Sequence, residues 1–412
     1  MAEIKSFRRV LIVADQSADW MVAGLRQLDR LALAVEEFAV ENKETAPVLV
    51  CIFWRPDLDQ SQRWVPTNER LARLAFTTDL GGQSFDLVLN TRLFLYRRAI
   101  RQLISEGRAS ARPITFEHAS FEIGDVRKHV PPSEEDLWQS HFRSVELVPH
   151  FREGVWEYIT DGNQIDEIEI KFLRGSGKSQ DGFVSRYLNR PISRALTRLL
   201  LRFPTTPNAW TLFILPIPIA AFFVLLQGTY WPFLWGLVLF QLFSVLDGCD
   251  GELARAKYLE SERGRRLDDF CDVLSNILLV AGLGCGLSRQ AIHAGSSGWF
   301  YLTEGLLAGA LIGLNEFLLA RRKPDGDVAQ APSFGGALYA RHRELVERSG
   351  MLRLGEPFAY WAMQLTKRDV AVLFFVFLAA IGQPALILHL LFAVTAISLA
   401  LVAKAFRPRR LE

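Results

Sequence analysis

The chain has 412 residues, of which 50% are hydrophobic, and a formal net charge of +2. This composition excludes both an entirely soluble globular protein and an entirely embedded one, and we expect no nucleic-acid partner. Residues 1–180 are rich in charged and amide side chains, whereas long apolar stretches fill the remainder. We therefore predict a multi-domain protein with a cytoplasmic domain over 1–180, an interfacial helix over 181–205 and a membrane domain over 206–412.

The first 180 residues alternate short apolar runs with helical patterns. The pattern predicts buried strands at Val10–Ala14, Val48–Phe53 and Asp86–Leu89, with helices at Ala23–Val40 and Arg92–Ile104. Strands that alternate with helices imply a parallel sheet in an α/β domain. The order of these elements resembles the core of the sugar nucleotidyltransferases.

The loop after the first strand departs from that resemblance. A nucleotidyltransferase needs a glycine-rich, basic loop there, because backbone amides must approach the triphosphate closely. Residues 15–20 instead read Asp-Gln-Ser-Ala-Asp-Trp. We expect a degenerate nucleotidyltransferase-like domain with a structural or regulatory role, and a divergent but working transferase is the alternative. Gly175–Ser179 echoes a phosphate-binding loop but lacks its first glycine, so it is interpreted as a hinge.

The stretch Ser185–Phe203 has the pattern of an amphipathic helix. Apolar residues populate one face, and arginines recur at every fourth position on the other. The pattern predicts a helix that lies on anionic lipid headgroups, and the alternative is a helix packed on the soluble domain. The arginines of this stripe are Arg190, Arg194, Arg198 and Arg202.

Long apolar segments in the second half predict an all-α membrane domain with six transmembrane helices. Positive charges concentrate in alternate loops, which predicts that both termini and the acidic region between the second and third segments lie on the cytoplasmic side of the inner membrane. Three polar residues, Glu304, Asn315 and Glu316, fall inside the fourth segment and predict either acceptor binding or helix association. The segments lie at 207–227, 230–248, 267–288, 298–319, 369–383 and 385–405.

Four aspartates follow a fixed spacing where the second apolar segment ends and the third begins. On continuous helices they line two faces, which could place four carboxylates around one small volume. Like charges that close are tolerable only around a cation, and carboxylate oxygens favour Mg²⁺, Mn²⁺ or Ca²⁺ over zinc. The full pattern consists of Asp247, Asp250, Gly251, Ala254, Arg255, Gly264, Asp268 and Asp272.

This pattern, which begins Leu-Asp-Gly-Cys-Asp-Gly-Glu-Leu-Ala-Arg at Leu246, resembles the signature of the CDP-alcohol phosphotransferase (CDP-alcohol phosphatidyltransferase) family. Every fixed position is present and the spacing shows no departure. The segments Asp181–Arg190 and Thr206–Asn208 are similar to one branch of that family, the di-myo-inositol-phosphate-phosphate synthases with a fused nucleotidyltransferase domain. The alternative is that the aspartates pair with arginines at crowded helix ends, which would require neither the spacing nor the glycines.

The resemblance implies a role for each position of the motif. Asp272 would take the proton from the acceptor hydroxyl as general base. Lys367 and Arg368 could bind an acceptor phosphate, or anchor a helix end at the headgroups. The Mg²⁺ or Mn²⁺ ligands would be Asp247, Asp250, Asp268 and Asp272, and the residues that bind the cytidine diphosphate would be Gly251, Ala254, Arg255 and Gly264.

The implied reaction moves a substituted phosphate from a CDP-alcohol to an acceptor hydroxyl and releases CMP, in phospholipid or inositol-phosphodiester synthesis. The donor would be of the CDP-diacylglycerol or CDP-inositol type, at the surface of the lipid bilayer. The family commonly forms homodimers, so a homodimer is expected. Two alternatives stay open, a bifunctional nucleotidyltransferase and di-inositol phosphodiester synthase, and a non-catalytic membrane scaffold.

Overall fold

The computed structural model describes residues 8–42, 46–55, 58–78, 85, 87–101, 114–115, 122–123, 156–175, 183–321 and 368–405. The predicted hinge lies outside these residues from position 176 onward. The chain forms two compact units. The first comprises residues 1–176 together with two short segments, Leu201–Phe203 and Arg255–Tyr258, and the second comprises the remainder.

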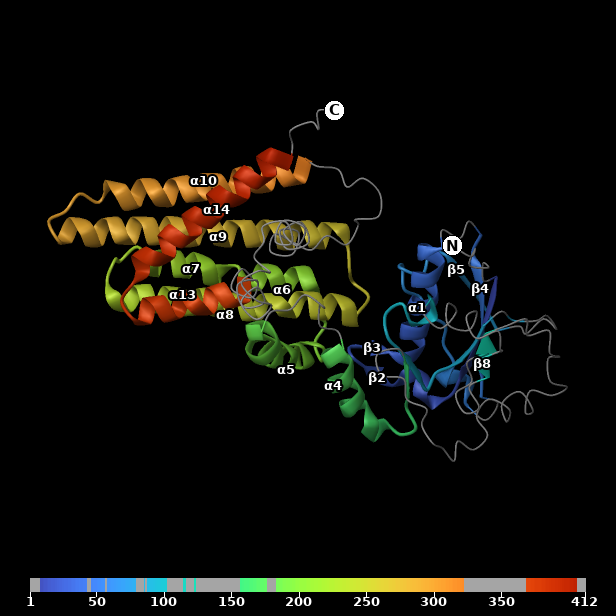
Figure 1. Ribbon diagram of the computed structural model, residues 1–412. Coiled ribbons are helices and arrows are strands. Elements are labelled where there is room, and N and C mark those ends of the chain that lie inside the picture. Colours follow the sequence, from blue (N-terminus) through green and yellow to red (C-terminus); the bar gives the residue numbers. More distant parts are fainter. Residues whose placement is uncertain are drawn as a thin grey trace, which may run out of the picture. The chain divides into compact units, whose positions relative to one another are not determined.

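A six-stranded sheet forms the core of the first unit (Figure 1). The first four strands in spatial order run parallel to one another. The fifth strand pairs antiparallel with the fourth, and the sixth pairs antiparallel with the fifth. The predicted α/β class with a parallel sheet is therefore confirmed, whereas β5 and the antiparallel edge were not predicted. The order is β5 (Leu74–Thr77), β4 (Val48–Trp54), β1 (Arg9–Ala14), β6 (Leu87–Asn90), β9 (Glu122–Ile123) and β8 (Ile114–Thr115).

Alternate residues of β1 pack into two different apolar clusters. Val10 and Ile12 join the large cluster that contains the buried face of α1 (Gln27–Glu41). Leu11 and Val13 point to the other side of the sheet, where they join a smaller cluster. Because both faces of the strand are buried, its sequence is an unbroken apolar run rather than an alternating one.

Helix α1 begins later than the predicted Ala23–Val40. A hairpin of β2 and β3 (Met21–Val22 and Leu25–Arg26) precedes it. The two turn residues, Ala23 and Gly24, have positive φ angles of 48° and 75°. Both lie in the left-handed region, which suits a two-residue hairpin turn and is incompatible with an α-helix.

The predicted helix Arg92–Ile104 is wrong over its first half. Leu93–Leu95 instead forms β7, which pairs antiparallel with β10 (Trp156–Tyr158). All three β7 side chains are buried, and the ring of Phe94 lies 5.3 Å from the ring of Phe172 in α4 (Ile165–Gly175). Tertiary burial of this apolar triplet overrides its local helical pattern.

Each of the six predicted apolar segments of the second unit is helical over most of its described residues. The first segment is divided at Leu215, because Pro216 begins a new helix. A five-residue π-helical turn at Ser185–Asn189 leads into the first α-helix of the unit. The helices are α5 (Arg190–Leu200), α6 (Pro207–Ile214), α7 (Pro216–Leu225), α8 (Tyr230–Ala256), α9 (Glu262–His293), α10 (Trp299–Arg321), α13 (Arg368–Ala380) and α14 (Pro384–Ala405).

Three helical stretches of the described chain are long and apolar enough to cross a membrane. They are Pro207–Leu225, Tyr230–Ala256 and Glu262–His293, and two shorter apolar helices follow at Asp369–Ala380 and Pro384–Ala400. These findings support a membrane protein. The number of six spans stays a prediction.

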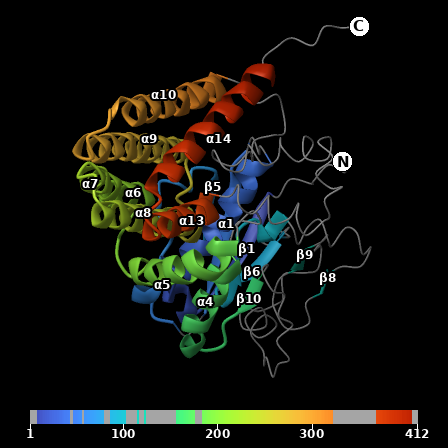
Figure 2. The same cartoon turned by 60° about the vertical axis from the view of Figure 1, so that its left-hand side comes forward.

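Helices α9, α10 and α14 lie side by side in both views (Figure 1 and Figure 2). Gly284 and Gly305 allow α9 and α10 to approach closely, since a Cβ on Gly284 would lie 2.9 Å from the Gly305 Cα. The His389 Nδ1 of α14 lies 2.8 Å from the Glu304 carboxylate of α10. Asn315 Nδ2 also donates to Ser398 Oγ at 3.3 Å. Helix association therefore accounts for Glu304 and Asn315.

Candidate active site

Three of the four predicted aspartates converge where α8 ends and α9 begins. The side chains of Asp247, Asp250 and Asp268 each offer a carboxylate oxygen, and these atoms lie within 4.8 Å of one another. Asp250 is buried, and the other two are half-buried. An all-oxygen, anionic set of this size fits a hard divalent cation such as Mg²⁺ or Mn²⁺.

Neighbouring helices hold the Asp250 side chain in place. Thr211 Oγ1 of α6 donates a hydrogen bond of 2.7 Å to Asp250 Oδ2, and the Gly251 amide donates to Oδ1. One turn before Asp250, Trp210 Nε1 of α6 donates to the Leu246 carbonyl at 2.9 Å. The two hydrogen bonds from α6 fix this part of α8, because each joins a different turn of the helix.

A buried glutamate joins the same part of α8 to α5. Glu252 is 1% exposed, and its Oε1 accepts from Arg190 Nη1 at 3.0 Å and from Ser193 Oγ at 2.9 Å. Its Oε2 accepts from Thr197 Oγ1 at 2.8 Å. A buried carboxylate with three hydrogen-bond donors, one of them cationic, is strongly oriented. Sequence reasoning missed Glu252, since it occupies a variable position of the motif.

This network corrects one part of the amphipathic-helix prediction. Arg190 was expected to lie on lipid headgroups, but its side chain is buried and bound to Glu252. Gly248 makes room for it, because a Cβ there would lie 3.3 Å from Arg190 Nη1. The exposed side of α5 carries apolar residues instead, among them Ile192 and Leu199.

Helix α9 begins directly before the second half of the motif. Ser261 is its N-cap and accepts from the Gly264 amide at 3.0 Å. Gly264 faces α6, where a Cβ at this position would lie 2.8 Å from Asn208 Oδ1. A larger residue at position 264 would therefore have to displace the Asn208 side chain.

The remaining predicted site residues lie outside the group of three carboxylates. Asp272 follows Asp268 by one helical turn on α9, and Arg255 stands in the last turn of α8. Lys367 lies outside the described residues, and Arg368 is the first residue of α13, where its side chain is not described. Asp369 beside it accepts a hydrogen bond from the Ser185 amide.

The first unit has a second polar cluster, at the carboxyl ends of β1 and β6. In open α/β sheets this edge is where ligands bind, because the strand order changes direction there. Asp15 is fully buried, accepts from the Ser17 amide at 2.8 Å and forms an ion pair with Arg92 Nη2 at 2.8 Å. Thr91 Oγ1 lies 2.7 Å from Ser17 Oγ. Asp15, Ser17, Thr91 and Arg92 are therefore joined in one polar network at this position.

The sequence comparison identifies the class of the second unit. Residues 204–403 match the sequence profile of the CDP-alcohol phosphatidyltransferases, so the C-terminal half of the chain is a domain of this transferase family. The predicted family resemblance is confirmed, and the converged aspartates lie inside the matched region.

Three similar proteins carry the name "Bifunctional IPC transferase and DIPP synthase". The one from Thermococcus kodakarensis is 44% identical over 142 residues, which are 34% of this chain and 29% of the relative. The Archaeoglobus fulgidus protein is 38% identical over 109 residues, 26% of this chain and 21% of the relative. The Rubrobacter xylanophilus protein is 35% identical over 158 residues, which are 38% of this chain and 34% of the relative. Each match thus spans about a third or less of the relative's length.

The Thr211 hydroxyl offers a test of the metal site that needs no substrate. Thr211→Val keeps the side-chain shape but removes the donor to Asp250, so we expect about tenfold weaker Mn²⁺ binding. Electron paramagnetic resonance of free Mn²⁺, titrated into detergent-solubilised protein, measures this affinity. Thr303→Val is the matched control, because that hydroxyl donates only to carbonyls of its own helix. Equal Mn²⁺ affinities in wild type and Thr211→Val would contradict the assignment of Asp250 as a metal ligand.

Proposed function

We propose that the protein is an integral membrane CDP-alcohol phosphotransferase. It moves a substituted phosphate from a CDP-alcohol to an acceptor hydroxyl and releases CMP. The observation that carries the proposal is the convergence of Asp247, Asp250 and Asp268 from two helices inside the family-matched region. Such a group of like charges destabilises the protein unless it binds a cation, so a structural scaffold would have no use for it.

The charges account for the steps of the reaction. The donor's pyrophosphate repels an incoming hydroxyl, and a Mg²⁺ or Mn²⁺ ion at the three aspartates would supply positive charge that offsets this repulsion. Asp247, Asp250 and Asp268 hold the ion, and Arg255 grips a phosphate oxygen of the cytidine diphosphate. Gly251, Ala254 and Gly264 leave room for that group. The acceptor oxygen bonds to the phosphorus that carries the donor alcohol, and the bond from this phosphorus to the CMP oxygen breaks.

Asp272 is proposed as the general base. It lies one turn along α9 from Asp268 and is half-buried. Its carboxylate takes the hydroxyl proton as the new bond forms. A second proposed role is as a further metal ligand, because its carboxylate follows the same helical face.

The proposed setting is the inner membrane, with six spans and both termini in the cytoplasm. Three stretches with transmembrane character and two shorter apolar helices support it. The exposed Ile192, Leu199 and Phe203 side chains of α5 and the turn after it support a position at the lipid surface. We propose a homodimer that associates through the membrane spans, because members of the family commonly form homodimers.

The donor is proposed to be of the CDP-inositol type, with CDP-diacylglycerol as the other candidate. The names of the relatives, which include a DIPP synthase activity, favour the first. Lys367 and Arg368 are proposed to bind an acceptor phosphate at the start of α13.

Purified protein in nanodiscs should release CMP from CDP-inositol or CDP-diacylglycerol when Mg²⁺ and a suitable acceptor alcohol are supplied. Asp268→Asn should reduce the rate at least about a hundredfold, since it removes a ligand charge. Asp269→Asn is the matched control, because Asp269 pairs with the exposed Arg265 at 3.2 Å and lies outside the group of three. Asp272→Asn should keep donor binding and lose turnover. No CMP from any donor and acceptor pair would refute the proposal.

A second candidate activity, nucleotide transfer by the first unit, is disfavoured by the hydrogen bonds and the ion pair that engage the Asp15 carboxylate. We expect no pyrophosphate release from CTP and inositol phosphate. An enzyme-coupled pyrophosphate assay with the full chain measures it, and release above a protein-free blank would show a working transferase.

A further inference from the structure

The end of α8 carries an unusual residue in its cap. Tyr258 has a φ of 56°, and the Leu259 amide donates to the Ala254 carbonyl at 2.8 Å. This backbone geometry is a Schellman cap, in which the left-handed position is normally glycine. A bulky aromatic residue is disfavoured there by sterics. The Tyr258 side chain must therefore contribute enough elsewhere to offset the strain of its backbone.

The Tyr258 ring is buried in the main core of the first unit, with 9% of the residue exposed. The Arg97 guanidinium carbon lies 4.4 Å from the ring centroid, and that of Arg30 lies 5.9 Å away. Arg30 is fully buried, and this burial lowers its pKa to about 10. Aromatic faces compensate part of the lost hydration of such a cation. The ring is thus part of the support for a buried charge.

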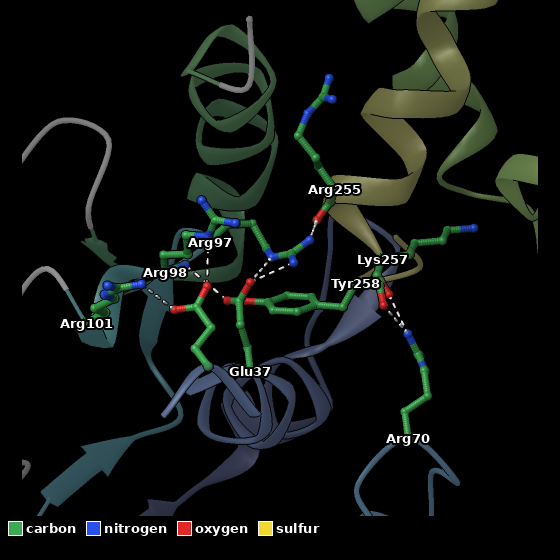
Figure 3. Close-up of polar contacts among 9 residues, drawn as sticks. Glu37, Arg70, Arg97, Arg98, Arg101, Arg255, Lys257 and Tyr258 are labelled. Carbon is green, nitrogen blue, oxygen red and sulfur yellow. Dashed lines mark hydrogen bonds and ion pairs between the residues drawn. The ribbon is translucent and has the colours of Figure 1, made fainter. Parts of the chain in front are cut away.

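Two arginines of the first unit bind the backbone next to this ring (Figure 3). Arg70 Nη1 donates to the carbonyls of Lys257 and Tyr258 at 2.8 and 2.9 Å. Arg97 Nη1 donates to the Arg255 carbonyl at 3.5 Å and is held by Glu37 through an ion pair of 2.6 Å. The last carbonyls of a helix lack intrahelical partners and carry partial negative charge, so cationic donors stabilise them.

Lys257 completes the attachment. Its Nζ donates to the Phe203 carbonyl at 2.8 Å, and Gly24 leaves space for its stem, since a Cβ there would lie 2.7 Å from Lys257 Cε. All four residues Arg255–Tyr258 belong by their contacts to the first unit, whereas Ala254 belongs to the second. The peptide chain therefore enters the first unit directly after the alanine of the aspartate motif.

We infer that Tyr258 is a positioning residue, through which the N-terminal α/β unit fixes the nucleotide-binding end of α8. The inference rests on the proposed function and assigns a role to the first unit in it. Arg255 and Ala254 lie within four residues of Tyr258, whereas Asp250 and Asp247 lie two or more turns away along the helix. Loosening the cap should therefore disturb the grip on the donor more than the metal ligands.

The test compares variants of the full-length protein in nanodiscs. Tyr258→Gly keeps the left-handed cap but removes the ring, so we expect the KM for the CDP-alcohol to rise about tenfold. The Mg²⁺ concentration for half-maximal rate should change less than about twofold. Tyr258→Phe retains the ring over both guanidinium groups and should restore the wild-type KM. A merely destabilising change would lower the active fraction and leave the KM unchanged.

A matched pair of arginine variants separates the loss of the contact with Tyr258 from the loss of one positive charge. Arg97→Met should raise the KM like Tyr258→Gly, whereas Arg101→Met should not. Arg101 is exposed, and its ion pair joins Glu41 at 3.5 Å. Hydrogen exchange of peptides covering residues 252–260 provides a readout without substrate, and exchange should be faster in Tyr258→Gly than in wild type. Unchanged exchange and unchanged KM would overturn the inference. Faster exchange in a protein whose wild type releases no CMP would instead refute the proposed function alone.

Discussion

Electrostatic repulsion among three carboxylates is the constraint around which the second unit is organised. Asp247, Asp250 and Asp268 lie within 4.8 Å of one another at the ends of two apolar helices, where hydration alone cannot stabilise them fully. Helix α6 donates hydrogen bonds to α8 on one side, and α5 holds Glu252 on another. The proposed divalent cation would complete this arrangement, because the surrounding donors orient the carboxylates without neutralising all of their charge.

The proposed role of the first unit depends on its contacts with the end of α8. Asp15 and Arg92 form an ion pair at the carboxyl ends of its strands, its core encloses Tyr258, and its arginines bind carbonyls at the end of α8. A domain can be required for activity without binding a substrate itself if it fixes a helix end. Such a helix end needs external donors, since its last carbonyls have no partners within the helix.

The sequence predicted those parts of the fold that depend on local pattern. Unbroken apolar runs located β1, β4 and β6, and the spacing of the motif located the aspartates that converge. The sequence-based prediction was wrong where contacts with distant residues determine the local structure, as in β7, which pairs with a strand more than 60 residues later. Arg190 and Glu252 are separated by 62 residues, and local sequence carries no record of that ion pair. The left-handed backbone conformation of Tyr258 was not predicted either, because glycine is the usual sequence signal for such a cap.

The most direct test of the account is a structure determined with Mn²⁺, using the anomalous signal of the metal in crystals of the full-length protein. We expect an anomalous peak that marks a Mn²⁺ ion coordinated by oxygens of Asp247, Asp250 and Asp268, at the short distances typical of a hard divalent ion. A map with the three carboxylates well ordered, turned away from one another and without a peak at saturating Mn²⁺ would contradict it.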